Sequence, residues 1–271
     1  MTPSPLVLPK PSTTQLKDAP LQLVVCQVRH DRVAGPRHGD QVLAIRDALT
    51  TSMGEELGLE QLAQQEVAFE FSPSGVSPLP NSGPSNGWRL RSRDGKWLVA
   101  LFPDFFALES TGYTSWSDFK TRLEALCGAV ERIFQPTLEQ RLGLRYVDSI
   151  NHPAVSTPKQ WAGYIEGSLL GPILHPQFGD AISGVQQVIH MPAPDEMQVL
   201  LRHGTQRDDS SGTWPYLLDT DCTRVSSRRF SCPEIVKGAG DLHELALQVF
   251  QASVTPELMR VLKGEGGFES N

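Results

Sequence analysis

Two short connections between apolar segments constrain the fold of this chain most strongly. Within Trp88–Phe102, the segments WRLRSR and KWLVALF meet at Asp94-Gly95, a pair that suits a two-residue type I′ turn. Segments Gln186–Met191 and Met197–His203 form a second such pair around A-P-D-E. Hairpins of this kind, interrupted by single helices, predict a mainly antiparallel sheet.

The other expected elements follow from hydrophobic periodicity and from capping residues. Strands are predicted at Leu21–His30, Glu66–Ser72, Arg141–Ile150 and Trp214–Cys222. Helices are predicted from about Asp40, Ser115, Thr157, Leu242 and Thr255, with a weaker helical stretch at Glu55–Gln64. The element order βαβββαβ, then αβββα, predicts an α+β fold in which several helices pack on the sheet. Its possible halves, residues 20–153 and 154–264, have a similar element order.

The 271 residues suit a single α+β domain over residues 20–264. Residues 1–19 are proline-rich and residues 265–271 are glycine-rich, which predicts a flexible tail at each end. The stretch Pro73–Gly87 is polar and rich in proline, glycine and serine, so it predicts a long loop. Disorder or an insertion explains that loop better than a lid over a site.

Composition and charge exclude several classes of partner. No apolar run approaches the length that spans a membrane, and no secretory signal is present, so we expect a cytoplasmic protein without a membrane partner. The four cysteines form no C-x-x-C pair and are expected in the core. The net charge of −7 makes binding of duplex nucleic acid unfavourable.

Two features carry the candidate chemistry. Arg145 lies inside a predicted strand, between Leu144 and Tyr146, where an unpaired guanidinium is costly to bury. Its partner is therefore a carboxylate or a bound anion, and the carboxylate is favoured. Asp219 and Asp221 in LLDTDC share one face of a strand and resemble a Mg²⁺ site, although a water-facing strand end explains them more simply.

No known catalytic signature accompanies these residues. The chain has no Walker A sequence, no G-x-G-x-x-G after a strand, no G-x-S-x-G elbow and no H-E-x-x-H pair. The catalytic residues stay unknown, and neither a cofactor nor a metal site is predicted.

Several stretches together carry a family resemblance. They are Pro20–Arg29, Phe105–Phe134, Leu142–Ile150, Leu217–Asp221 and the helical stretch LHELALQVFQASVTPELMRVL. With them, the chain from residue 20 onward resembles a sporadically distributed family of uncharacterised bacterial and archaeal proteins of about this length. The resemblance implies no activity. The patchy distribution suggests accessory genes, such as those of defence or toxin–antitoxin-like systems, which is an association only.

The leading hypothesis is a non-catalytic binding or accessory protein, such as a sensing subunit, that contacts a protein partner or a small ligand. Homo-oligomers are compatible with this role. The expected contact residues are Arg29, Arg145, Tyr146, Asp219 and Asp221. One alternative is a metal-assisted hydrolase or nuclease that uses the two aspartates, with Arg145 as an anion clamp. A less favoured alternative is single-stranded RNA binding through Trp88, Trp97 and the alternating arginines of the hairpin.

Overall fold

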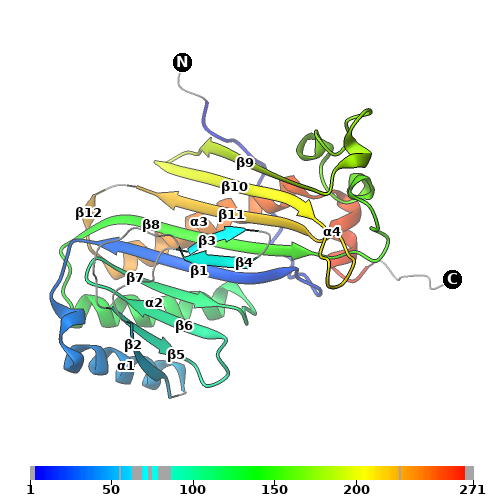
Figure 1. The fold of residues 1–271 in the computed structure, drawn as a ribbon. Helices are drawn as coiled ribbons and strands as arrows, with labels where there is room; N and C mark the ends of the chain where they lie inside the picture. Colours follow the sequence, from blue (N-terminus) through cyan, green and yellow to red (C-terminus); the bar gives the residue numbers. More distant parts are fainter. Residues whose placement is uncertain are drawn as a thin grey trace.

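A computed structural model describes residues 4–54, 56–62, 69–72, 75–78, 87–225 and 227–265, without the side chains of residues 37, 69–72 and 75–78. One antiparallel sheet of ten strands, in the order β2-β5-β6-β7-β1-β8-β11-β10-β9 with β12 paired to β8, forms its centre. Helices α1, α2 and α3 lie on one face of the sheet (Figure 1). The predicted α+β class with an antiparallel sheet is confirmed.

The strands are β1 (Leu21–His30), β2 (Gly58–Leu62), β3 (Phe69–Ser72), β4 (Gly75–Pro78), β5 (Gly87–Arg91), β6 (Trp97–Leu101), β7 (Phe105–Ser110), β8 (Leu138–Ile150), β9 (Gly184–Pro192), β10 (Met197–Gln206), β11 (Tyr216–Arg224) and β12 (Arg228–Arg229). The α-helices are α1 (Gly39–Met53), α2 (Trp116–Ile133), α3 (Cys232–Ser253) and α4 (Pro256–Leu262). Four short 3₁₀ helices are η1 (Gly35–Arg37), η2 (Pro158–Gly163), η3 (Gly167–Leu170) and η4 (Gly179–Ala181). Strands β3 and β4 pair only with each other among the described strands.

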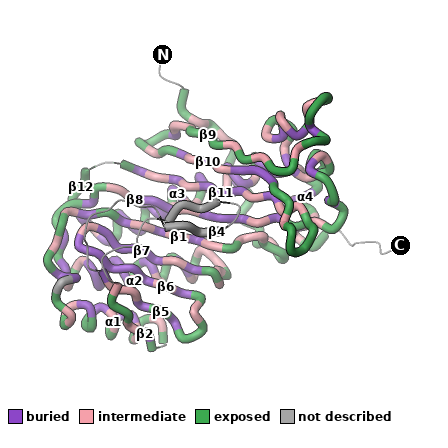
Figure 2. Tube along the Cα trace, viewed as in Figure 1, coloured by how far each residue is buried: buried purple, intermediate pink, exposed green. Residues whose placement is uncertain are grey.

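Strand β8 occupies the centre of the sheet because it pairs with β1 on one side and with β11 on the other. Its side chains alternate between the two faces of the sheet. Leu142 and Leu144 are fully buried beneath the helices, whereas Arg141 and Arg145 project from the opposite face. Burial is concentrated along this central part of the sheet (Figure 2).

Helix α2 shows how local sequence determines an element boundary. The Ser115 side chain accepts a hydrogen bond from the Asp118 N–H at 3.2 Å, which confirms the predicted cap. Phe119, Leu123 and Leu126 are fully buried on one side of the helix. Among the described helices, none is long and apolar enough to cross a membrane.

The two halves of the sheet mirror each other around the β1–β8 pair. Strands β5, β6 and β7 form a meander whose last strand returns beside β1, and helix α2 follows. Strands β9, β10 and β11 form a second meander that returns beside β8, and α3 follows after β12. The spatial repeat therefore divides the chain between α2 and β8, and not at the predicted boundary between residues 153 and 154, which would leave β8 in the first half.

Two predicted elements differ because sheet pairing overrides local preference. The stretch Glu55–Gln64 was expected to be helical, but its residues Gly58–Leu62 form edge strand β2 along β5. Strand β7 was not predicted at all, although it lies between β6 and β1. The expectation failed because Phe105–Ala107 is apolar on both faces and shows no alternation.

Turn and helix geometry differs from expectation in two other places. At the β5–β6 turn, the Gly95 N–H donates to the Ser92 oxygen at 2.9 Å, and only Gly95 has a positive φ, so the turn is not type I′. The helix predicted from Thr157 is the short 3₁₀ helix η2, although the expected capping box with Gln160 is present. After η2 the chain forms separate turns rather than one apolar helical stripe.

Residues 4–19 of the predicted flexible tail are attached to the domain, and residues 1–3 lie outside the described part. Leu6 donates its N–H to the Pro192 oxygen at 2.7 Å, and Ser12 exchanges two hydrogen bonds with the Gln251 side chain. Asp18 donates its N–H to the Leu262 oxygen at 3.0 Å. Prolines keep this segment extended, and its leucines supply the contacts with the core that a polar tail would lack.

Some predicted stretches fall partly outside the described residues. Within the predicted strand Glu66–Ser72, Phe69–Ser72 form β3, and within the predicted loop Pro73–Gly87, Gly75–Pro78 form β4. The rest of both stretches, except Gly87, and residues 266–271 of the predicted C-terminal tail lie outside the described part. The four cysteines are free and buried, as expected.

A buried ion pair ties the sheet to α3. The Arg224 Nη2 donates to Glu139 Oε1 at 3.0 Å and to Oε2 at 3.2 Å, and both side chains are almost fully buried. A Cβ on Gly238 would lie 2.4 Å from Arg224 Nη1, so the missing side chain provides the space for the guanidinium. Strands β8 and β11 and helix α3 therefore meet at one charge pair.

We predict that Glu139→Gln lowers the free energy of unfolding by about 3 kcal/mol, because the Arg224 guanidinium is left buried without its counter-charge. Urea denaturation followed by circular dichroism measures this change. The matched control is Glu257→Gln in the exposed pair with Arg260, which should change stability little. Equal effects of the two substitutions would contradict the prediction.

Candidate functional site

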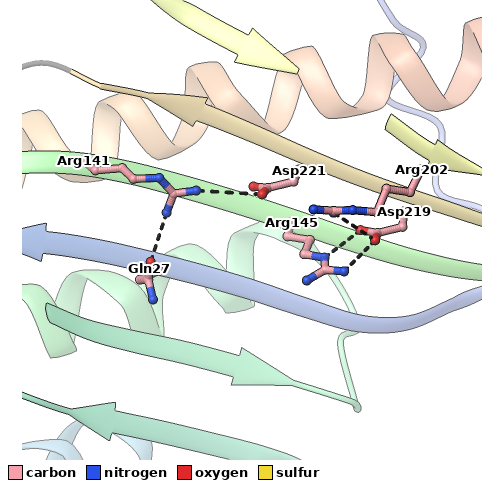
Figure 3. A network of polar contacts seen from close by, with 6 residues as sticks. All are labelled: Gln27, Arg141, Arg145, Arg202, Asp219 and Asp221. Atoms are coloured by element: carbon pink, nitrogen blue, oxygen red, sulfur yellow. Dashed lines mark hydrogen bonds and ion pairs between the residues drawn. The ribbon is translucent and has the colours of Figure 1, made fainter. Parts of the chain in front are cut away.

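The guanidinium of Arg145 forms an ion pair with the Asp219 carboxylate on the neighbouring strand, β11. Arg145 Nε donates to Asp219 Oδ1 at 2.6 Å, and its Nη2 donates to Oδ2 at 2.5 Å (Figure 3). The side chain of Asp219 is 1% exposed and that of Arg145 is 14% exposed. The favoured expectation, a carboxylate partner, is confirmed, whereas Asp219 is not at a water-facing strand end.

A second arginine shares the same carboxylate. Arg202 on β10 donates from Nη1 to Asp219 Oδ2 at 3.2 Å, and Arg202 and Asp219 face each other across the β10–β11 ladder. Asp219 is thus held between guanidinium groups from the strands on either side of β11. This arrangement leaves the local charge of the trio positive.

Beside this trio, Arg141 lies near Asp221 at a longer distance than Arg145 lies from Asp219. Arg141 Nη1 donates to the Gln27 side-chain oxygen at 3.0 Å, and its Nη2 lies 3.8 Å from Asp221 Oδ2. Burial raises the pKa of Asp221, although the arginines around it act in the opposite direction. Arg29 stands directly opposite Arg141 in the β1–β8 ladder and is exposed.

These residues form one surface, which we call the arginine network. It consists of Gln27, Arg29, Arg141, Arg145, Arg202, Asp219 and Asp221 on strands β1, β8, β11 and β10. Arg141, Arg145 and Arg202 contact the two carboxylates on the side of the sheet away from the helices (Figure 3), and Arg29 lies beside Arg141 on the same face. Among its described members, four arginines accompany two aspartates, in a chain whose net charge is −7.

Tyr146, the remaining expected contact residue, lies on the opposite face of the sheet. Its hydroxyl shares a 2.7 Å hydrogen bond with His243 Nδ1 of α3, and the His243 ring stacks on Trp116 at 4.4 Å. Burial lowers the pKa of His243 to about 4, so this histidine is neutral at pH 7. The cluster joins α2 and α3 to the sheet, and the structure does not bring Tyr146 together with the arginine network.

Asp148 lies on the helix-facing side of β8, as Tyr146 does, and is 7% exposed. Its carboxyl has no hydrogen bond or ion pair with any residue that the structure describes. Burial, together with the negative charge of Asp219, raises the pKa of Asp148 to about 7. The group is therefore partly protonated near neutral pH.

The tryptophans expected to stack on RNA bases do not share a face with the arginines of the hairpin. Trp97 is 7% exposed in the core, where Arg122 lies 4.2 Å from its ring centre. Trp88 is half-buried and donates from Nε1 to the Pro36 oxygen at 2.6 Å. Arg89 alternates with Trp88 and projects from the other face, so no joint stacking and basic surface forms.

A cavity of about 620 Å³ lies apart from the arginine network, between the β9–β10 turn and α3. Asp195 and Glu196 from the turn, Arg224 and Arg228, and Glu234 and Lys237 of α3 line it. Arg228 Nη2 lies 2.9 Å from Glu196 Oε2, and Arg224 is held by Glu139. The lining has mixed charge and its arginines are already engaged, which makes the cavity a weaker candidate for an anionic ligand.

Three of the network residues were not expected from sequence as contact residues: Gln27, Arg141 and Arg202. Gln27 and Arg141 share faces with the expected Arg29 and Arg145, so strand parity was a signal for them. Arg202 carried no such signal, because its position beside Asp219 depends on the strand order and on the register of β10 with β11. A charge pair between two strands can be predicted only when both the strand order and the register are known.

No protein-family model matches this sequence, and no curated protein matches it significantly. Among the described residues, no group of three or more histidine, cysteine, aspartate or glutamate side chains is arranged to hold a metal ion.

We predict that Asp219→Asn lowers the free energy of unfolding by about 3 kcal/mol, because Arg145 loses the negative charge that its burial requires. Asp221→Asn is the matched control and should cost clearly less, because its nearest guanidinium nitrogen is 3.8 Å away. Urea denaturation of both variants at one pH compares them. A larger loss for Asp221→Asn would show that Asp219 does not hold the network.

A second prediction concerns pH. Between the ordinary pKa of 3.8 and the folded value of about 7, Asp148 stays protonated in the folded chain while it ionises in the unfolded chain. Its contribution to stability is therefore present below about pH 4 and is lost as pH rises toward 7. Asp148→Asn removes this dependence.

The difference in unfolding free energy between the Asp148→Asn variant and the unsubstituted protein should rise by about 3 kcal/mol, in favour of the variant, from pH 5 to pH 8. Urea titrations of both proteins at the two pH values give the difference. Comparing the two proteins cancels the other titrating groups. A difference that does not change with pH would mean that Asp148 keeps its ordinary pKa.

Proposed function

We propose that this protein is a non-catalytic binding protein that holds an anionic group of a partner against the arginine network. The partner's carboxylate or phosphate would be bound by guanidinium groups, which present paired donors in a planar fork. Such a protein would act as an accessory or sensing subunit in the cytoplasm, in line with the accessory role that the family resemblance suggests. We also propose that this subunit belongs to a bacterial defence or toxin–antitoxin-like system.

The close approach of Arg29 and Arg141 within the described part of the arginine network carries this proposal. Arg29 and Arg141 lie directly opposite each other in the β1–β8 ladder, where like charges destabilise a sheet. Arg141 is held by a neutral amide at 3.0 Å and by a carboxylate only at 3.8 Å. A bound anion between the two guanidinium groups would remove this repulsion.

The geometry also accounts for our preference over the alternative, a metal-assisted hydrolase or nuclease. Both oxygens of Asp219 already accept hydrogen bonds from Arg145, and Arg202 adds a third. A cation placed between Asp219 and Asp221 would approach these guanidinium groups and would have to displace them. Hard cations such as Mg²⁺ also need several free oxygen ligands.

We predict that Arg141→Ala weakens capture of the native partner by about tenfold, because one charged hydrogen bond to a ligand contributes about 1.4 kcal/mol or more. Tagged protein isolated from cells of its native source, followed by quantitative mass spectrometry of the bound material, measures capture. Arg132→Ala, an exposed position on α2, is the matched control and should capture the partner as the unsubstituted protein does.

Two outcomes would contradict the proposed function. The first is a protein that isolates with nothing bound and converts a substrate on its own. The second is a rise in thermal melting temperature with Mg²⁺ or Mn²⁺ that Asp221→Asn abolishes, which would support the hydrolase alternative.

A further inference from the structure

Strand β9 ends the ten-stranded sheet, and among the described strands β10 is its only partner. Its nine residues, GVQQVIHMP, include no charged side chain, and its ladder with β10 runs without a register shift. Proteins commonly protect a free sheet edge with charges, bulges, interior prolines or a covering segment. At the Pro192 end of β9, the N-terminal segment already occupies the edge, because the Leu6 N–H donates to the Pro192 oxygen at 2.7 Å. From Gln186 to His190, no described residue donates a backbone N–H to the free side of the strand and no proline interrupts it.

The direction of the free backbone groups follows from two hydrogen bonds. The Pro192 oxygen accepts from the Leu6 N–H, so it points away from β10, whereas the Ala193 N–H donates to Met197 at the β10 side. In an antiparallel strand, the N–H and C=O of one residue point the same way, and they reverse at the next residue. Gln186, Val188 and His190 therefore direct their backbone groups outward.

The side chains of β9 are only partly covered. Val188 is 53% exposed, and Figure 2 shows β9 as exposed or half-buried along its length. Val185, Ile189 and Met191 pack against the core with one side and are half-buried. Both faces of the edge thus retain apolar surface that another strand would cover.

We propose, beyond the anion-binding function, that β9 is the docking site for β9 of a second copy of this chain. The two strands would pair antiparallel around a two-fold axis at Val188. The outward groups of Gln186, Val188 and His190 would then form about six backbone hydrogen bonds between the copies. The product is one continuous sheet that runs through both copies.

Self-pairing fits the side chains on both faces of the strand. Around this axis Val188 meets Val188, and Gln186 meets His190, so no charges face each other. On the helix side, Val185 meets Met191 and Gln187 meets Ile189. A symmetric dimer requires a surface that complements itself in this way, and neutrality matters here because each copy carries a net charge of −7.

The test measures weight-average mass by sedimentation equilibrium on the full chain. An edge contact of one strand pair is small, so concentrations from about 1 to about 200 µM are required. The unsubstituted protein should approach twice the monomer mass. Val188→Lys places like charges on the axis and should raise the dimer dissociation constant about tenfold or more. Val225→Lys, at a similarly exposed valine outside the sheet edge, should leave it unchanged.

Val188→Pro removes one outward N–H while the hydrogen bonds to β10 stay in place, so it should give a monomer with an unchanged circular dichroism spectrum. Cross-linking of the Val188→Cys variant tests the same contact without disrupting it. A short bis-maleimide should link two copies through Cys at position 188 and should not link them in the Val225→Cys control.

A monomeric unsubstituted protein at the highest concentration, or a dimer that Val188→Lys and Val188→Pro leave intact, would overturn the proposal. Pairing of β9 with a strand of a different protein would also overturn it.

Discussion

The pairing of β8 with β1 on one edge and β11 on the other is the contact on which the remaining structure depends. It forces alternate residues of β8 to opposite faces, so Leu142 and Leu144 pack under the helices while Arg141 and Arg145 project from the other side. Charges are tolerable at the centre of a sheet only because β11 presents Asp219 and Asp221 within reach. The same pairing therefore builds both the core and the arginine network.

The mirrored order of strands around β1 and β8 explains how one sheet contains both halves of the chain. Each half contributes one central strand, a three-stranded meander that returns beside it, and a helix that packs on the same face. Between its central strand and its meander, the first half contains η1, α1 and strands β2, β3 and β4, whereas the second half contains the 3₁₀ helices η2, η3 and η4. The sequence shows no residue-level repeat, so the likeness is one of topology.

Sequence was sufficient where the signal is local. The Ser115 cap, the long helix that follows it and the strand alternation around Leu142 and Leu144 depend on residues a few positions apart. Sequence failed where a distant partner decides the outcome, as in β2, which becomes a strand along β5. The network divides in the same way: Arg145 could be expected to need a carboxylate, but the choice of Asp219 depends on the register of β8 with β11.

The extended N-terminal segment contacts parts of the chain that are far away in sequence. Ser12 is bonded to Gln251 of α3, and Asp18 is bonded to Leu262 at the end of α4. During synthesis these residues emerge from the ribosome long before their partners exist. The segment can reach its final position only after α3 and α4 have been made and have packed on the sheet, so its attachment is among the last steps of folding in the cell.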